Sequence, residues 1–426
     1  MQEEAGGAAR RAAVERFEAV RHQTESLSAN LAPEDQSIQS MPDVSPTKWH
    51  LGHTTWFFET FLLMRFDADY RAFDPAFGYL FNSYYEAAGP RHPRPERGLL
   101  SRPTLDIVMA YRDHVSAATA RLVERAGEAE WAELAPLLEL GIHHEQQHQE
   151  LILMDIKHVF SMNPLLPAYQ APQLQVQAPA RSIAWVDFPG GLKEIGHPGS
   201  GFAFDNEGPR HKVWLEPFRL ATRPTTCGEY LGFIEEGGYH RPEFWLSDGW
   251  ATVRERGWEA PLYWLWDNEE WSIFTLSGRR RLNLAEPVCH LSLYEADAFA
   301  RWAGKRLPTE VEWETAAEGL PLSGNFADRG HFHPCADASS DAVPQLQQMY
   351  GDVWEWTASP YTAYPRFRPA GGAIGEYNGK FMCNQIVLRG GAAVTPRGHM
   401  RATYRNFFQP SARWAFAGLR LAEDIG

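Results

Sequence analysis

Residues 140–158 read LGIHHEQQHQELILMDIKH. This stretch decides the fold of the first half of the chain and carries the strongest indication of its chemistry. His144 and His148 are four residues apart, so on a helix their imidazoles lie on one face and can reach one metal ion. An earlier stretch, residues 45–59, reads SPTKWHLGHTTWFFE and contains His53. Helical bundles commonly build metal sites from side chains on facing helices. Together the two stretches predict a metal site formed by His53, His144 and His148.

The spacing of apolar residues predicts four helices in residues 1–165, which is typical of an antiparallel bundle. One of them begins at Ser45-Pro46, with serine as the N-cap and proline as the first helical residue. The other three cover residues 8–31, 104–126 and 131–160, and Pro136 could break the last of them. The aromatic and basic segment 73–103 is too long for a simple connection, which favours a functional loop.

The residues around these histidines do not by themselves identify the metal ion. Three neutral imidazoles leave coordination positions free for substrate and oxygen. However, residues 144–148 also satisfy the H-E-x-x-H pattern of zinc hydrolases, with Glu145 as the general base. His50 and His143 compete as ligands because they lie next to the favoured residues. Glu150 points about 200° around an ideal helix from His148, so it is a poor ligand partner for that residue.

The second half of the chain differs from the first in composition and in the pattern of its apolar residues. Residues 163–181 are rich in Pro, Gln and Ala, which indicates a linker. Beyond them, short strand-like runs alternate with Gly, Pro, Asn and Asp, and the stretch from Ser292 to Trp302 predicts a helix. These patterns predict a multidomain α and α+β chain. The predicted boundaries are 1–165 for the bundle, 166–182 for the linker and 183–426 for the α+β domain.

The composition of the chain argues against some classes of function. The chain has 426 residues, with 40 Lys and Arg against 54 Asp and Glu, which gives a net charge of −14. This acidic balance argues against nucleic-acid partners. The sequence has no apolar run long enough to span a membrane and no signal-peptide pattern at its N-terminus. Its four cysteines lack C-x-x-C spacing, so a reduced, cytoplasmic protein is expected.

The quoted stretches also resemble a known family. PTKWHLGHTTWFFE followed far downstream by HHEQQHQE is similar to the DinB-type helical domain of the nonheme iron sulfoxide synthases of ergothioneine biosynthesis. The second half resembles the formylglycine-generating-enzyme-like domain, which has a C-type-lectin-like core. Its matching motifs are FAFDNEGPRHKV, KRLPTEVEWETAA, GDVWEWTASPY, VLRGG, RATYRNFF and FAGLRLA. Formylglycine-generating enzymes use cysteines after the RGG motif, whereas residues 389–406 here contain none. The resemblance therefore implies that the second domain supplies a pocket wall.

The resemblance implies an Fe(II)- and O2-dependent enzyme that joins the imidazole C2 carbon of hercynine to a thiol sulfur. The ligands would be His53, His144 and His148, with Glu150 matching the last position of the family's H-x3-H-x-E signature. Proton delivery needs a weak acid near the metal, and Tyr84 and Tyr85 match a tyrosine pair of the subgroup that uses free cysteine. Tyr377 is the competitor from the second half of the chain.

The resemblance also implies substrate contacts. The predicted set for hercynine is Gln147, Asn406, Phe407 and Phe408, because aromatic faces bind quaternary ammonium groups. Arg91 and Arg94, with Arg97 nearby, could hold the carboxylate of the sulfur donor. Phe407 and Phe408 stand where other subgroups carry charged residues for γ-glutamylcysteine, which favours cysteine. Two alternatives stay open, a selenoneine synthase that uses a selenosugar and a zinc-dependent thiol transferase or hydrolase. A homo-oligomer is compatible with either.

Overall fold

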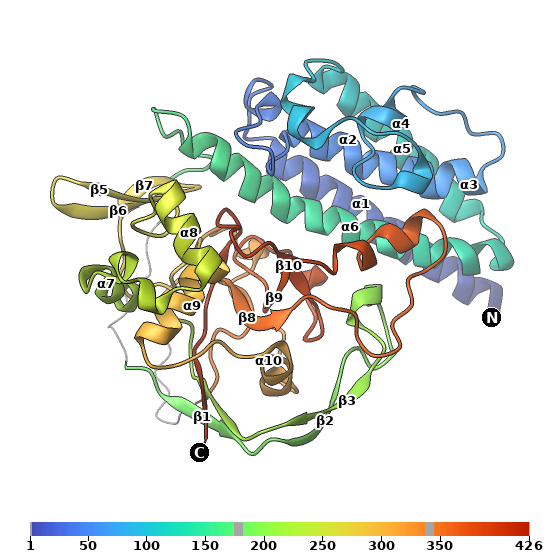
Figure 1. Cartoon of the computed structure of the whole chain (residues 1–426). Coiled ribbons are helices and arrows are strands. Elements are labelled where there is room, and N and C mark those ends of the chain that lie inside the picture. Colours follow the sequence, from blue (N-terminus) through green and yellow to red (C-terminus); the bar gives the residue numbers. More distant parts are fainter. Residues whose placement is uncertain (1, 174–181, 337–344, 426) are drawn as a thin grey trace. The chain divides into compact units, whose positions relative to one another are not determined.

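A computed structural model describes residues 2–173, 182–336 and 345–425 (Figure 1). The chain divides into two compact units. The first comprises Met1–Leu165 together with Ala370–Tyr377, and the second comprises Leu166–Pro369 and Asn378–Gly426. Part of the predicted linker, residues 174–181, lies outside the described residues, and the predicted domain boundaries stay a prediction. The return of Ala370–Tyr377 to the first unit was not expected from the sequence.

The first unit is built on four long helices that pack side by side (Figure 1). They are α1 (Gln2–Ser28), α2 (Thr47–Phe58), α5 (Leu105–Arg125) and α6 (Glu128–Ser161). The prediction of a helical bundle is therefore confirmed. Two details differ: α2 begins at Thr47 with Pro46 as its N-cap, and α6 continues through Pro136 without a break. Proline removes one backbone hydrogen bond, but Leu134 and Leu138 on either side of it are buried and hold the helix against the core.

One buried carboxylate ties the start of the segment between α2 and α5 to the bundle. Beyond α2 the chain runs through a π-helical turn, η2 (Glu59–Leu63), and the short helix α3 (Met64–Phe66). Glu59 accepts hydrogen bonds from the hydroxyls of Tyr70, at 2.7 Å, and Tyr111, at 2.5 Å, and from the backbone of Phe73, at 3.0 Å. The rest of the segment forms α4 (Phe77–Leu80), η3 (Glu86–Ala88) and η4 (Arg94–Leu99). The long predicted loop is thus fixed to the bundle at its start.

Within its described residues, the second unit contains four small sheets, with strand orders β1-β4-β12, β10-β9-β8-β11, β2-β3 and β5-β6-β7. Except for the parallel pair β8–β11, the paired strands are antiparallel. Strands β1 to β6 are Trp185–Phe188, Gly191–Ile195, His211–Leu215, Phe218–Ala221, Trp264–Asp267 and Glu270–Thr275. Strands β7 to β12 are Gly278–Arg281, Trp354–Pro360, Ile386–Arg389, Asn406–Phe408, Ala417–Gly418 and Ala422–Asp424. These strands confirm the predicted sheet-containing domain.

The described part of the second unit contains four α-helices, and all but the second of them begin at a side-chain cap. They are α7 (Cys227–Glu235), α8 (Ser247–Arg256), α9 (Leu293–Trp302) and α10 (Glu310–Ala317). Ser292 caps α9 and exchanges hydrogen bonds with Glu295, while Thr309 and Glu312 do the same at α10. Each capping box satisfies backbone N–H groups that a helix start leaves unpaired. This explains why the predicted helix from Ser292 starts where the sequence indicates.

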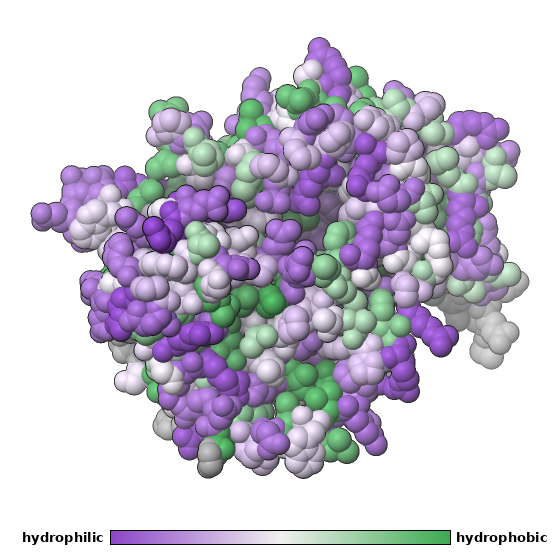
Figure 2. Space-filling view, in the orientation of Figure 1, coloured by the Kyte–Doolittle hydropathy of each residue, from purple (hydrophilic) through white to green (hydrophobic). Residues whose placement is uncertain are grey.

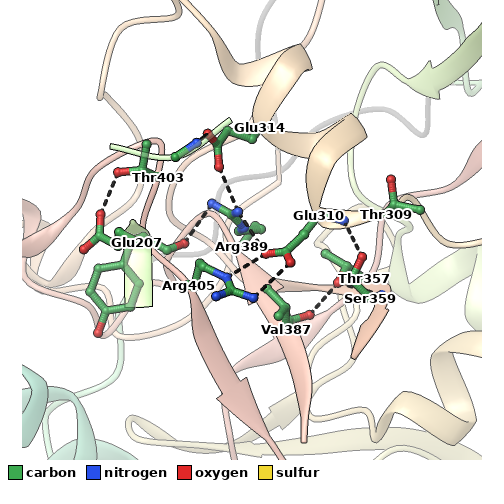
Figure 3. Close-up of polar contacts among 12 residues, drawn as sticks. Glu207, Thr309, Glu310, Glu314, Thr357, Ser359, Val387, Arg389, Thr403 and Arg405 are labelled. Atoms are coloured by element: carbon green, nitrogen blue, oxygen red, sulfur yellow. Dashed lines mark hydrogen bonds and ion pairs between the residues drawn. The ribbon is translucent and has the colours of Figure 1, made fainter. Parts of the chain in front are cut away.

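The core of the second unit holds a buried ion network (Figure 3). Arg405 donates to both carboxylate oxygens of Glu310, at 2.9 and 3.0 Å. Arg389 bridges Glu310, at 3.1 Å, and Glu314, at 2.9 Å. Burial alone would raise the pKa of Glu310, but the guanidinium groups of Arg405 and Arg389 lower it below its ordinary value. The network therefore ties α10 to β9 and to the segment before β10 with matched charges.

The surface agrees with the sequence composition. Within the described residues no helix is long and apolar enough to cross a membrane. On the face shown in Figure 2, hydrophilic and hydrophobic residues are interspersed.

Candidate metal centre

Three buried imidazoles meet inside the bundle, one from α2 and two from α6. His53, His144 and His148 each offer one nitrogen, and these nitrogens lie within 4.8 Å of one another. The Nε2 atoms of His53 and His144 are 3.1 Å apart. Among the described residues this is the one group of three or more metal-ligating side chains. The structure therefore brings together the three histidines that the sequence singled out.

A hydrogen bond and two aromatic contacts orient the ring of His53. Its Nδ1 donates to the backbone carbonyl of Phe81 at 2.6 Å, which leaves the lone pair of Nε2 free to face the other imidazoles. The indoles of Trp49 and Trp56 stack on the two sides of the ring, with centroids 4.6 and 5.5 Å away. The tryptophans of the quoted stretch thus fix the orientation of a candidate ligand.

Burial keeps the three imidazoles neutral. It lowers the pKa of His144 to about 3, and it lowers the pKa values of His53 and His148 well below the ordinary value. A neutral imidazole is the form that binds a metal ion. The Nδ1 atom of His144 is also buried without a hydrogen-bond partner. Three converging neutral nitrogen donors fit a bound divalent transition metal.

Glu145, the general base of the zinc-hydrolase alternative, does not act with the imidazoles. Its carboxylate is buried between Arg21, at 3.0 Å, and Arg112, at 2.9 Å. Burial would raise its pKa, but these two guanidinium groups lower it to about 2. A carboxylate held in two ion pairs is not free to take a proton from water. The H-E-x-x-H match is therefore a feature of the bundle core.

The remaining histidine and glutamate candidates lie outside the group. His143 hydrogen-bonds Glu139, at 3.2 Å, and Arg16, at 3.0 Å. His50 lies behind His148, with its Nδ1 atom 2.8 Å from that of His148. Glu150 is buried on α6 and is not part of the three-histidine group. Neither competitor histidine replaces a predicted ligand.

The three candidate tyrosines all lie in the first unit. The hydroxyls of Tyr84 and Tyr85 are 3.5 Å apart, and their rings stack with centroids separated by 4.5 Å. Tyr85 is fully buried against Trp56, and burial raises its pKa well above the ordinary value. Tyr377 lies beside the imidazoles, with its ring centroid 5.8 Å from that of His144. Its hydroxyl donates to the side-chain oxygen of Gln147.

The position of Tyr377 depends on a contact that the sequence did not indicate. Tyr377 follows η9 (Ala373–Glu376), which belongs to the first unit. The carboxylate of Glu376 accepts hydrogen bonds from the backbone N–H groups of Glu86, at 3.0 Å, and Ala87, at 2.8 Å. Two backbone donors at the start of η3 therefore hold this segment next to the Tyr84–Tyr85 loop. Glu376 carried no motif, so only the fold reveals it.

The arginines after the tyrosine pair differ in exposure. Arg91 is partly exposed and forms an ion pair with Glu86 at 2.5 Å. Arg94 donates to the backbone carbonyl of Asp43 at 2.5 Å. Arg97 is buried, and its guanidinium lies 3.4 Å from the ring centroid of Trp49. Arg97 is thus connected to the metal centre through the indole that stacks on His53.

Comparison with known proteins agrees with this architecture. Residues 171–425 match the Sulfatase-modifying factor enzyme 1-like domain family, and residues 16–152 match the DinB superfamily. Hercynine oxygenase of Mycolicibacterium thermoresistibile is 32% identical over 420 residues, which cover 90% of this chain and 88% of that protein. The Mycobacterium tuberculosis protein of the same name is 32% identical, with coverage of 90% and 92%. The Mycolicibacterium smegmatis protein is 34% identical, with coverage of 67% and 71%.

The chain belongs to the hercynine oxygenase family. Membership confirms the predicted resemblance and the predicted enzyme class, an oxidoreductase. The two domain families in this order also confirm the predicted fold class.

The predicted hercynine contacts Asn406, Phe407 and Phe408 lie in the second unit. Asn406, Phe407 and Phe408 form β10, which pairs with β9. Phe407 stacks on Tyr361, with centroids 4.1 Å apart and planes inclined by 10°. The side-chain oxygen of Asn406 accepts a hydrogen bond from the backbone of Phe407 at 2.9 Å. The strand therefore presents its aromatic residues on a rigid edge of the sheet.

Proposed function

We propose that this chain is an Fe(II)- and O2-dependent sulfoxide synthase that joins the imidazole C2 carbon of hercynine to the sulfur of cysteine. The reaction balances without an added reductant. The C2–H and S–H bonds break, the C–S bond forms, one oxygen atom of O2 becomes the sulfoxide oxygen, and the other leaves as water. The family of the chain supports hercynine as substrate, because the similar proteins carry the name hercynine oxygenase.

The observation that carries this proposal is the buried set of three neutral imidazoles. His53, His144 and His148 would hold the metal and leave coordination positions open for small ligands. When bound, Fe(II) would supply redox chemistry with O2 and a Lewis-acidic template for the thiol. No protein nucleophile is required for this reaction.

We further propose that a buried phenol supplies the proton during the reaction, since a weak acid near the metal keeps its proton at neutral pH. Tyr84 and Tyr85 are the predicted pair. Their rings stack on each other, and the ring of Tyr85 contacts that of Trp56. Tyr377 is the alternative donor, supported by its contacts with His144 and Gln147. The proton donor and the neutral imidazoles would then come from one folded unit.

Substrate binding would use charge and aromatic faces. The hercynine set stays Gln147, Asn406, Phe407 and Phe408, in which the two phenylalanines suit a quaternary ammonium group. Arg91 and Arg94 would attract the cysteine carboxylate, because both guanidinium groups belong to the segment that follows the tyrosine pair. Gln147 has the strongest support of these contacts because it lies on α6 between His144 and His148.

The zinc-hydrolase alternative is not supported, because Glu145 is confined to its ion pairs with Arg21 and Arg112. Glu145→Gln should therefore lower stability and leave metal binding intact. The selenoneine alternative shares the metal centre and differs only in the donor, so it is tested in the same assay.

The test loads the enzyme with Fe(II) without oxygen and then adds hercynine and O2 with one of three donors. The donors are cysteine, γ-glutamylcysteine and a selenosugar, and mass spectrometry identifies the products. We expect a product with the combined mass of hercynine, cysteine and O2 less one water. A C–Se product formed in preference would favour the selenoneine alternative. Absence of any conjugate with all three donors would overturn the proposal.

A further inference from the structure

A chain of hydrogen bonds runs from His148 through His50 to Asp155, away from the other two imidazoles. Nδ1 of His148 lies 2.8 Å from Nδ1 of His50, and Nε2 of His50 lies 3.0 Å from Oδ2 of Asp155. All three side chains are buried. The backbone N–H of Ser45 donates to the same Oδ2 atom at 2.8 Å, which anchors the carboxylate at the start of α2.

The order of donors along this chain determines which nitrogen of His148 is free. Asp155 as a carboxylate accepts only, so Nε2 of His50 carries the proton between them. A neutral His50 then accepts at Nδ1, and Nδ1 of His148 must be the donor. The lone pair of His148 is therefore on Nε2, as on His53. Metal-ligating histidines commonly donate their second N–H to a carboxylate or carbonyl in this way, which orients the ring.

The three imidazoles differ in the group that their second ring nitrogen contacts. His53 donates to the carbonyl of Phe81, and Nδ1 of His144 has no hydrogen-bond partner. His148 alone of the three is connected to a carboxylate, through a second imidazole. A charged acceptor makes the hydrogen bonds of such a chain stronger than a neutral carbonyl does. Of the three candidate ligands, His148 is thus the one whose metal-binding nitrogen gains the most basicity from its hydrogen bonds.

The fold explains why the chain forms between the two helices that carry the ligands. His50 precedes His53 by three residues on α2, and Asp155 follows His148 by seven on α6, so each shares a helix face with a ligand. Arg97 covers this layer from η4, where it donates to the hydroxyl of Ser45 at 2.9 Å and stacks on Trp49. The charged groups that face His50 are therefore Asp155, Arg97 and Arg94.

We propose that His50 and Asp155 are positioning residues of the metal centre, which hold His148 with Nε2 directed at the metal ion. The inference rests on the metal centre of the proposed function. His50 itself is not a ligand, since its two nitrogens are both used in the chain. Its side chain acts on the metal only through the ring of His148.

The test titrates the metal-free enzyme with Co(II) and follows the visible absorption of the bound ion, which reports both affinity and ligand geometry. His50→Leu should weaken Co(II) binding by about 10–100-fold and change the spectrum, because Nδ1 of His148 loses its acceptor. His50→Gln should restore part of the affinity, since an amide can accept from His148 and donate to Asp155. Asp155→Asn should fall between the wild type and His50→Leu.

The matched control is His143→Gln, which removes another buried histidine of α6 whose hydrogen bonds run to Glu139 and Arg16. It should leave Co(II) affinity and spectrum unchanged. Thermal unfolding without metal identifies variants that have lost the fold, and if His50→Leu is one of them, His50→Gln and Asp155→Asn decide. Wild-type affinity and spectrum in the folded variants would overturn the inference. If His148→Ala also bound Co(II) as the wild type does, the metal centre of the proposed function would fail instead.

Discussion

The metal centre of the first unit and the ion network of the second treat buried polar groups in opposite ways. In the second unit, the acceptor oxygens of Glu310 face guanidinium donors from Arg389 and Arg405. In the first, three imidazoles direct nitrogens at one another within 4.8 Å. Burying polar groups is unfavourable unless they are paired. The ion network of the second unit is complete within the protein, whereas the converging nitrogens of the first unit suit a cation, and this difference separates a structural cluster from a candidate metal centre.

The largest effect is expected from removing a ligand. His53→Ala or His148→Ala should lower Fe(II) affinity and product formation by more than about 100-fold, because outer-shell partners alone contribute about 10–100-fold. Metal content after dialysis and the rate of conjugate formation measure the two effects. Variants that kept both metal and activity would show that the imidazole cluster is structural, like the ion network.

Breaking the network should instead reduce stability. Arg389→Leu leaves the buried Glu314 without its guanidinium partner, while Arg405 still pairs with both oxygens of Glu310, and such loss costs about 3–5 kcal/mol. Urea unfolding of the metal-free protein measures this change. Arg281→Leu is the control, because it breaks an exposed ion pair with Glu270 that is worth about 0–1 kcal/mol. An equal effect of both substitutions would contradict the role given to burial.

The tyrosines test which buried phenol serves the metal centre. Substitution of the proton donor by phenylalanine should slow sulfoxide formation by about 100-fold or more, or divert O2 to oxidation of the thiol alone. Tyr84→Phe, Tyr85→Phe and Tyr377→Phe are compared by the ratio of conjugate to oxidised cysteine. A changed ratio in Tyr377→Phe alone would assign the role to the residue beside His144. Unchanged ratios in all three would assign it to water.

The smallest effect concerns a buried carboxylate of the second unit that has neutral donors only. Burial raises the pKa of Asp352 to about 6, although Asn325 and Gln348 donate to it. Between pH 4 and 6 the folded state keeps a proton that the unfolded state has lost, so Asp352 destabilises the fold as pH rises through this range. The unfolding free energy at pH 7 minus that at pH 4 should be more positive in Asp352→Asn than in the wild type, by roughly 2 kcal/mol. An equal pH dependence in both proteins would contradict this.

Much of this architecture was readable in the sequence. The long helices and the capped starts of α9 and α10 follow from local patterns, and the prediction of His144 and His148 as metal ligands follows from their spacing. The extension of α6 through Pro136 does not follow from local rules, because the packing of the buried Leu134 and Leu138 opposes the break that proline favours. The link from His50 to Asp155 could have been suspected, since each lies on the face of a ligand.

By itself, then, the sequence determined the helices, the family and the three histidines, because these depend on local periodicity and on motifs. Only the tertiary structure decided that Glu145 is held by Arg21 and Arg112, that His50 stands behind His148, and that Glu376 places Tyr377 beside His144. Each of these contacts joins residues from different helices or from distant parts of the chain. Which of several polar neighbours meets which partner depends on how the elements pack, and no local pattern contains that information.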